Sequence, residues 1–245
     1  IRNLFGLTVI LLIMVRTGTG ITRTHQPVMQ VMRNLVHLVA VSTWFWGITQ
    51  LPLVEVFVLE STMPIWVTIL ATLLLGEQLT RSRVTGVILG FIGVLIILRP
   101  GLAIVDPAAL VVLAGAISFA GAAVATKTLT RTDAPLTILF WMFVVQLTAT
   151  TLIAGPTIFV PPADMVPWAI AVGLSGMAAH YCTARSLVLA DVGLVTPLHY
   201  LRIPLIAWVG WVLYDEAVDV WLFVGALVIF VGTMATIRTA RRSPE

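Results

Sequence analysis

The sequence predicts an all-α membrane protein, a polytopic helical bundle built from two inverted-topology repeats. Three observations lead to this prediction. Of the 245 residues, 59% are hydrophobic and only 10% are charged, whereas an ordinary soluble domain carries about 25% charged residues. The apolar residues form long continuous runs, and equivalent residues recur at an offset of 139 positions, the difference between Glu77 and Glu216.

Nine apolar runs fit transmembrane helices, for which a bilayer core needs about 20 residues. The first run is short and the connections between runs are rich in glycine, proline and charged residues. The expected transmembrane helices are residues 4–15, 35–50, 53–75, 84–98, 108–126, 135–154, 166–187, 192–213 and 219–237.

Lysine and arginine are unevenly distributed over the connections. If the connection between the first two helices is cytoplasmic, ten basic residues lie inside, and only Arg2 and Arg99 lie outside. Because short cytoplasmic loops carry an excess of Lys and Arg, this pattern predicts a cytoplasmic C-terminus. The ten are Arg16, Arg23, Arg33, Arg81, Arg83, Lys127, Arg131, Arg238, Arg241 and Arg242.

The repeat consists of a glutamate and two glycines with the same spacing in both copies. Its members are Glu77, Gly86 and Gly93 in the first copy, and Glu216, Gly225 and Gly232 in the second. The paired glycines are seven residues apart, so they share a helix face and predict close helix packing. The predicted topology places the two glutamates on opposite sides of the membrane, which makes the repeats inverted, as in many secondary transporters.

The repeat divides the chain into a first copy (residues 1–101, four helices), a second copy (102–240, five helices) and a cytoplasmic tail (241–245). The helix equivalent to residues 108–126 is missing from the first copy. We expect it upstream of residue 1, which would give the complete protein ten helices.

Ordered motifs in both copies resemble the EamA repeat of the drug/metabolite transporter superfamily. The first copy carries Leu51-Pro52-Leu53, Pro64, Leu75-Gly76-Glu77, Gly86, Gly90-Phe91-Ile92-Gly93 and Arg99-Pro100-Gly101. The second copy carries Ala190-Asp191, Pro197, Pro204, Glu216, Gly225 and Gly232, but it has Tyr214-Asp215-Glu216 in place of Leu75-Gly76-Glu77.

The resemblance implies a secondary transporter in the bacterial inner membrane that moves a small metabolite or an amphipathic compound by alternating access. It also implies a central cavity lined in this chain by residues 35–50, 53–75, 108–126, 166–187 and 192–213. The family transports varied compounds, so the resemblance does not name a substrate.

Ionisable residues inside the apolar runs are the first candidates for a binding site, because each costs about 2.5–3.5 kcal/mol at mid-membrane. Glu60 and His199 are equivalent in the two copies, and Arg202 is three residues after His199. We expect these three to form a polar cluster that binds substrate or protons, with Glu60 as the proton-coupling residue. A purely structural ion pair between the copies is the alternative.

Further candidates are less specific. Glu55 is a second proton-coupling candidate, although it does not share a helix face with Glu60. Helix breaks at proline can mark a binding site or only a packing kink, and aromatic rings can stack on a ligand or anchor the membrane interface. The remaining substrate-binding candidates are Pro64, Pro204, Trp44, Trp46, His180 and Tyr181.

Several classes of function find no support. The lone Cys182 excludes an intrachain disulfide and a cysteine metal cluster, and we expect no cofactor, no metal and no nucleic-acid partner. A channel or membrane scaffold is the main alternative to a transporter. The motif Gly173-Leu174-Ser175-Gly176, together with His199, makes an intramembrane serine protease a remote alternative. A serine nucleophile requires a base and oxyanion donors, and we expect no enzyme.

Overall fold

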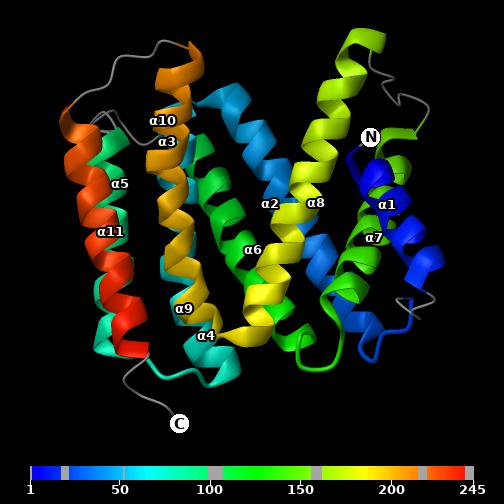
Figure 1. Ribbon diagram of the computed structural model, residues 1–245, viewed down its shortest axis with the longest axis horizontal. Helices are drawn as coiled ribbons and strands as arrows, with labels where there is room; N and C mark the ends of the chain where they lie inside the picture. The colour runs from blue at the N-terminus through cyan, green and yellow to red at the C-terminus, as the bar shows by residue number, and fades with distance from the viewer. Residues whose placement is uncertain are drawn as a thin grey trace. The chain divides into compact units, whose positions relative to one another are not determined.

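The computed structural model describes residues 2–17, 22–51, 53–98, 107–155, 162–214 and 220–240. Within these residues the secondary structure is helical and contains no strand (Figure 1). The α-helices are α1 (Arg2–Thr17), α2 (Pro27–Gln50), α3 (Leu53–Glu60), α4 (Met63–Leu75), α5 (Arg81–Leu98), α6 (Pro107–Leu129), α7 (Pro135–Ala154), α8 (Val166–Leu189), α9 (Val192–Val195), α10 (Arg202–Tyr214) and α11 (Val220–Ala240). Two 3₁₀ segments, η2 (Ala163–Met165) and η3 (Thr196–Leu201), precede α8 and α10.

The predicted helical membrane fold is confirmed, and the predicted transmembrane segments fall on helices. The third segment is interrupted between α3 and α4, and the eighth consists of α9, η3 and α10. The last begins at Asp219, which lies outside the described residues. Among the described residues, length and apolar composition alone identify three stretches long enough to cross a membrane, Glu55–Leu75, Pro107–Leu129 and Pro135–Ile153.

The chain divides into two compact units, each containing residues from both predicted repeats. Unit 1 comprises Ile1–Leu38 and Ala125–Leu189, and unit 2 comprises Val39–Val124 and Ala190–Glu245. The repeat boundaries themselves, 1–101 and 102–240, stay a prediction. Their flanking residues 99–106, the counterpart glutamate Glu216 and the tail 241–245 lie outside the described residues.

Unit 1 is built around an apolar core formed by α1, α7 and α8. Ile10, Phe143 and Ala184 are almost completely buried there. A Cβ placed at Gly6 would lie 2.4 Å from the Phe143 ring, so only glycine lets α1 approach this side chain. Next to this core, α2 contributes a buried polar surface that is described below.

In unit 2, α5 and α11 lie side by side (Figure 1). A Cβ at Gly93 would lie 2.7 Å from the carbonyl oxygen of Gly225, and a Cβ at Gly225 would lie 2.7 Å from that of Gly93. The two backbones therefore touch where the glycines meet. Further along α11, a Cβ at Gly232 would lie 3.3 Å from the carbonyl oxygen of Gly86. Small residues permit such close approach of helices in membranes.

Candidate functional site

Glu60 and Arg202, two members of the predicted polar cluster, form an ion pair in unit 2. Nη2 of Arg202 lies 2.9 Å from Oε1 of Glu60. The indole Nε1 of Trp44 donates to the other carboxylate oxygen, Oε2, at 3.0 Å. The Glu60 side chain is 14% exposed and that of Arg202 is 44% exposed. The carboxylate is therefore bound by one charged and one neutral donor, and the guanidinium remains accessible.

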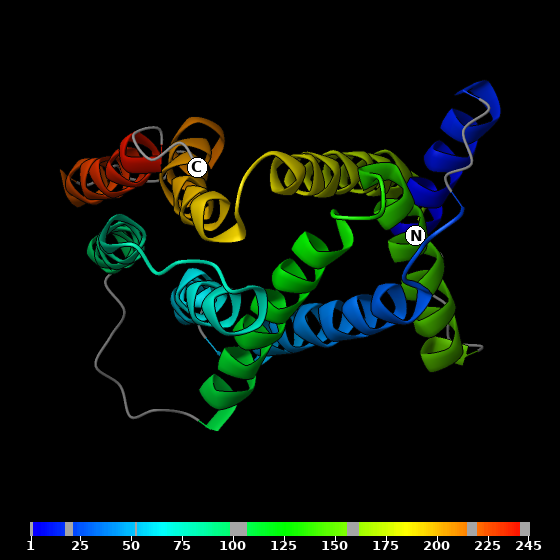
Figure 2. The same ribbon diagram turned by 90° about the horizontal axis from the view of Figure 1, so that it is seen from below.

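The pair lies where two helices are interrupted, because Glu60 ends α3 and Arg202 begins α10. Pro64 has no N–H to donate to the carbonyl of Glu60, and Pro204 has none for the carbonyl of Tyr200. Between α3 and α4 the backbone instead forms a hydrogen bond between residues three apart, in which Thr62 N donates to the carbonyl of Leu59 at 3.1 Å. Figure 2 shows α4 beside α9 in unit 2, so the two interrupted segments are neighbours.

His199, the third predicted member, lies on the same face as Arg202. Both belong to the turn formed by η3 and the start of α10, and residues three apart eclipse in a 3₁₀ helix. Its imidazole is close enough to Glu60 and Arg202 to interact electrostatically with both. No hydrogen bond joins it to either residue within the described part of the chain.

Phe57 is a member of the site that the sequence reasoning missed. The guanidinium carbon of Arg202 lies 5.9 Å from the centroid of the Phe57 ring, within the range of a cation–π interaction. Trp44 packs edge-on against the same ring, with centroids 6.1 Å apart. Phe57 is three residues before Glu60 on α3, so the spacing of one helical turn was the signal that could have identified it.

The other candidates in unit 2 are not part of this cluster. Trp46 is 43% exposed and lies about 200° around α2 from Trp44, because the two are two positions apart in the sequence. Glu55 is half-buried and has no ion pair among the described residues.

His180 belongs to a different polar group, in unit 1. Its ring meets the ring of His37 edge-on, with centroids 5.2 Å apart, and Nδ1 of His37 lies 2.9 Å from Nε2 of Gln146. His37 and Gln146 are buried and the sequence reasoning missed both. Tyr181, the neighbour of His180, is 38% exposed.

Glu77, the glutamate of the first predicted repeat, accepts hydrogen bonds from the start of α9. Its two carboxylate oxygens accept from the backbone N–H groups of Val192 at 3.0 Å and Gly193 at 3.1 Å. Arg83 bridges the same carboxylate, at 3.0 Å, to Asp191, at 2.5 Å. This network joins the connection between α4 and α5 to the segment that carries His199 and Arg202.

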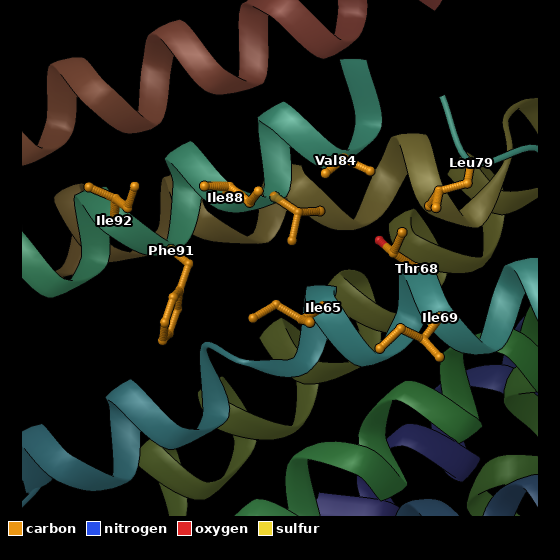
Figure 3. A pocket seen from close by; sticks show the side chains of 9 residues that line it. Ile65, Thr68, Ile69, Leu79, Val84, Ile88, Phe91 and Ile92 are labelled. Atoms are coloured by element: carbon orange, nitrogen blue, oxygen red, sulfur yellow. The ribbon is translucent and has the colours of Figure 1, made fainter. Parts of the chain in front are cut away.

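An apolar groove of about 340 Å³ lies between α4 and α5 (Figure 3). Its one polar side chain, Thr68, donates its hydroxyl to the carbonyl of Pro64 at 2.8 Å, which leaves an apolar lining toward the groove. The lining residues are Ile65, Thr68, Ile69, Leu79, Val84, Val87, Ile88, Phe91 and Ile92.

The geometry gives no support to protease chemistry or to a metal site. The Ser175 hydroxyl donates to the carbonyl of Val172 in its own helix at 3.2 Å. In the described residues, no three His, Cys, Asp or Glu side chains are grouped so that they could hold a metal ion.

The sequence profile of the EamA-like transporter family matches residues 1–99 and 106–238. The chain is also similar to proteins named as transporters. It is 29% identical over 243 residues to a riboflavin transporter of Brucella anthropi, covering 97% of this chain and 86% of the relative.

Two other relatives carry different substrate names. The chain is 24% identical to an S-adenosylmethionine uptake transporter of Rickettsia prowazekii, covering 99% of this chain and 82% of that protein. It is 26% identical to a pseudopaline exporter of Pseudomonas aeruginosa, covering 98% and 85%. A crystal structure with 20% sequence identity superposes with a TM-score of 0.79 over 98% of this chain and 86% of the other, which supports the fold alone.

Proposed function

Because the chain belongs to the EamA-like transporter family, we propose that it is a secondary transporter that moves a small metabolite across the bacterial inner membrane by alternating access. The family and the relatives named as transporters indicate a multi-pass membrane transporter and not an enzyme. The observation that carries the mechanistic proposal is the ion pair of Glu60 and Arg202, which lies at the interruptions of two membrane helices.

The ion pair is suited to binding because its two partners are unequally satisfied. Glu60 accepts from Arg202 and from Trp44, whereas the guanidinium has five donors and remains 44% exposed. A substrate with an acceptor group can therefore bind Arg202 without first separating the pair. The rings of Trp44 and Phe57 beside the pair offer a surface on which a flat substrate can stack.

Glu60 also supplies a route to proton coupling. Its charge is stabilised by Arg202, and protonation would remove that attraction and free the guanidinium. In the proposed cycle, Glu60 binds a proton when the site opens to the proton-rich side and releases it when Arg202 pairs with Glu60 again. The half-buried Glu55 is a second candidate for this proton.

The broken helices provide the movement that such a cycle requires. Interrupted helices at corresponding places of inverted repeats form the central binding sites of many secondary transporters. Here Pro64 and Pro204 follow Glu60 and Arg202 by four and two residues, so a change in either break would move a charged partner directly.

Solute counterflow in proteoliposomes tests this proposal. Vesicles containing the full-length protein are preloaded with a compound selected by thermal stabilisation, and uptake of the labelled compound is measured against its external concentration. A transporter gives saturable uptake that depends on the internal load, and we expect Arg202→Gln to raise the half-saturating concentration. Uptake that neither saturates nor depends on the internal load would indicate a channel. No uptake of any stabilising compound would contradict a transport function.

A further inference from the structure

Arg33 is a buried cation that has no anionic partner among the described residues. Its side chain lies on α2 in unit 1 and only 6% of the residue is exposed. Nε donates to the hydroxyl of Thr126 at 3.0 Å, and Nη1 donates to Oδ1 of Asn34 at 2.7 Å. In the part of the chain that the structure describes, the Arg33 side chain makes no other hydrogen bond and no ion pair.

The charge balance of unit 1 explains why no described carboxylate neutralises Arg33. Among the residues of unit 1, seven are Lys or Arg and only two, Asp133 and Asp164, are acidic. Asp133 is occupied by neutral donors, because it accepts from the Thr24 hydroxyl, from His25 N at 3.0 Å and from Gln30 Nε2 at 2.8 Å. Asp164 lies in η2, at the other end of α7 from Asp133.

A buried guanidinium in this situation is costly unless an anion joins it. Removing an ion from water costs several kcal/mol even after relaxation, and neutral hydrogen bonds offset this only in part. Guanidinium has five N–H donors in a planar fork, and two of those of Arg33 are used. The remaining three match the two oxygens of a carboxylate or of a phosphate group.

The surroundings of Arg33 are polar along one face of α2. Gln30, Asn34 and His37 lie on the same face, at spacings of three and four residues, and all are buried. Asn34 is fixed from both sides, since its Nδ2 donates to the carbonyl of Gln30 at 2.8 Å. These contacts hold the guanidinium in one orientation, as a preformed site requires.

The position of Arg33 is also suited to access from water. It is six residues after Pro27, where α2 begins, which corresponds to about 9 Å along the helix. An anion would therefore need to pass only the first turns of α2 to reach it, not the middle of the bilayer.

From this geometry we propose that Arg33, held by Asn34 and Thr126, binds the carboxylate or phosphate group of a transported substrate. The proposal rests on the transport function proposed above, and it adds that the substrate class is anionic. Arg33 belongs to unit 1, whereas Glu60 and Arg202 belong to unit 2.

Thermal unfolding of the full-length protein in phosphatidylcholine nanodiscs tests the proposal. The probes are inorganic phosphate and succinate, compared with chloride at equal ionic strength, and the readout is tryptophan fluorescence. At about ten times the dissociation constant, we expect either probe to raise the unfolding midpoint by about 3–6 °C. Arg33→Gln should lose this shift, and the ligand-free variant should be at least as stable as wild type because an unneutralised charge has been removed.

Two further variants complete the experiment. Arg185→Gln removes an exposed arginine of the same unit and should leave the anion shift unchanged. Arg33→Lys keeps the charge without the planar fork, so the half-saturating concentration of phosphate or succinate should rise about tenfold or more. This variant also tests the proposal if Arg33→Gln does not fold. An unchanged half-saturating concentration in Arg33→Lys, a retained shift in Arg33→Gln, or no shift in wild type would overturn the proposal.

The lipid distinguishes two sources of the anion. Two effects of phosphatidylglycerol in place of phosphatidylcholine are measured on wild type: a higher unfolding midpoint and loss of the succinate shift. If both effects occur and both require Arg33, the bound group is a lipid headgroup, and the assignment to a substrate is overturned. A succinate shift that persists in both lipids supports a soluble anion. Because binding is measured without transport, loss of counterflow with an intact Arg33-dependent shift would refute the proposed function and not this site.

Discussion

Replacing Gly93 by leucine should destabilise the contact between α5 and α11. A Cβ at this position would lie 2.7 Å from the carbonyl oxygen of Gly225, whereas ordinary contacts begin at 3.4 Å. The two helices must then separate locally by about 0.7 Å, which is the difference between these distances. The atom in the way belongs to the backbone, so no rotamer change can relieve the clash.

The remaining atoms of the leucine side chain add to this cost. A Cβ at Gly93 would also lie 2.6 Å from Cγ1 of Ile229, a residue that is fully buried. Overpacking of a filled core costs about 3 kcal/mol at the upper end of its usual range. For a chain of this size, that corresponds to a fall of about 6–12 °C in the unfolding midpoint.

The assay is thermal unfolding of the purified protein in detergent, with Thr85→Leu as the matched control. Thr85 lies on the same helix but is exposed, so the same side chain should change the midpoint little. Gly225→Leu should resemble Gly93→Leu, and the double variant should lose less than the sum because both substitutions separate the same helices. A Gly93→Leu midpoint within about 1 °C of wild type would contradict a tight backbone contact between α5 and α11 at this glycine.

Two further predictions concern carboxylates outside the membrane-spanning segments. Glu77→Gln should lower the free energy of unfolding by about 1–3 kcal/mol, because an amide cannot accept from both Val192 N and Gly193 N while bound to Arg83. Thermal unfolding measures this loss of stability, with Gln78→Ala at the exposed neighbouring position as the control. A loss no larger than that of Gln78→Ala would contradict the prediction. Burial works to raise the pKa of Asp133, but hydrogen bonds from Thr24, His25 N and Gln30 outweigh it and hold that pKa below its ordinary value. The stabilisation by Asp133 should therefore be complete above about pH 5 and disappear as the pH falls through the lowered pKa. Asp133→Asn should be less stable than wild type at pH 7, and the difference in unfolding midpoint should become smaller toward about pH 3. Asp164→Asn is the control. A difference between Asp133→Asn and wild type that does not depend on pH would contradict the prediction.

Much of the fold was predictable because membrane helices occur in the sequence as continuous apolar runs. The predicted segment 135–154 coincides with α7, whose limits are a proline at its start and Gly155, with a φ of +54°, after its end. The start of α2 was missed, because the polar residues Gln30, Arg33 and Asn34 were assigned to a connection. They are helical because their polar groups find partners in unit 1, and those partners are distant in sequence.

The candidate site shows the same limit. The equivalence of Glu60 with His199, and the spacing of His199 and Arg202, predicted that the ionisable residues lie together. The contacts of Trp44 with Glu60 and of Phe57 with Arg202 depend on side-chain directions that spacing alone does not give. His37 and Gln146 meet across 109 positions, and no repeat or motif links them.

Transport driven by a pH gradient, compared between wild type and Glu60→Gln, tests whether the ion pair of Glu60 and Arg202 couples protons to transport. Proteoliposomes containing wild type or the variant are given a pH gradient, and uptake of a compound that shows counterflow is measured with and without the gradient, using Asp164→Asn, at an exposed position, as the control. We expect the gradient to accelerate uptake by wild type, and we expect Glu60→Gln still to exchange the compound but no longer to respond to the gradient. A variant that responds to the gradient as wild type does would contradict the assignment of Glu60 as the proton-coupling residue.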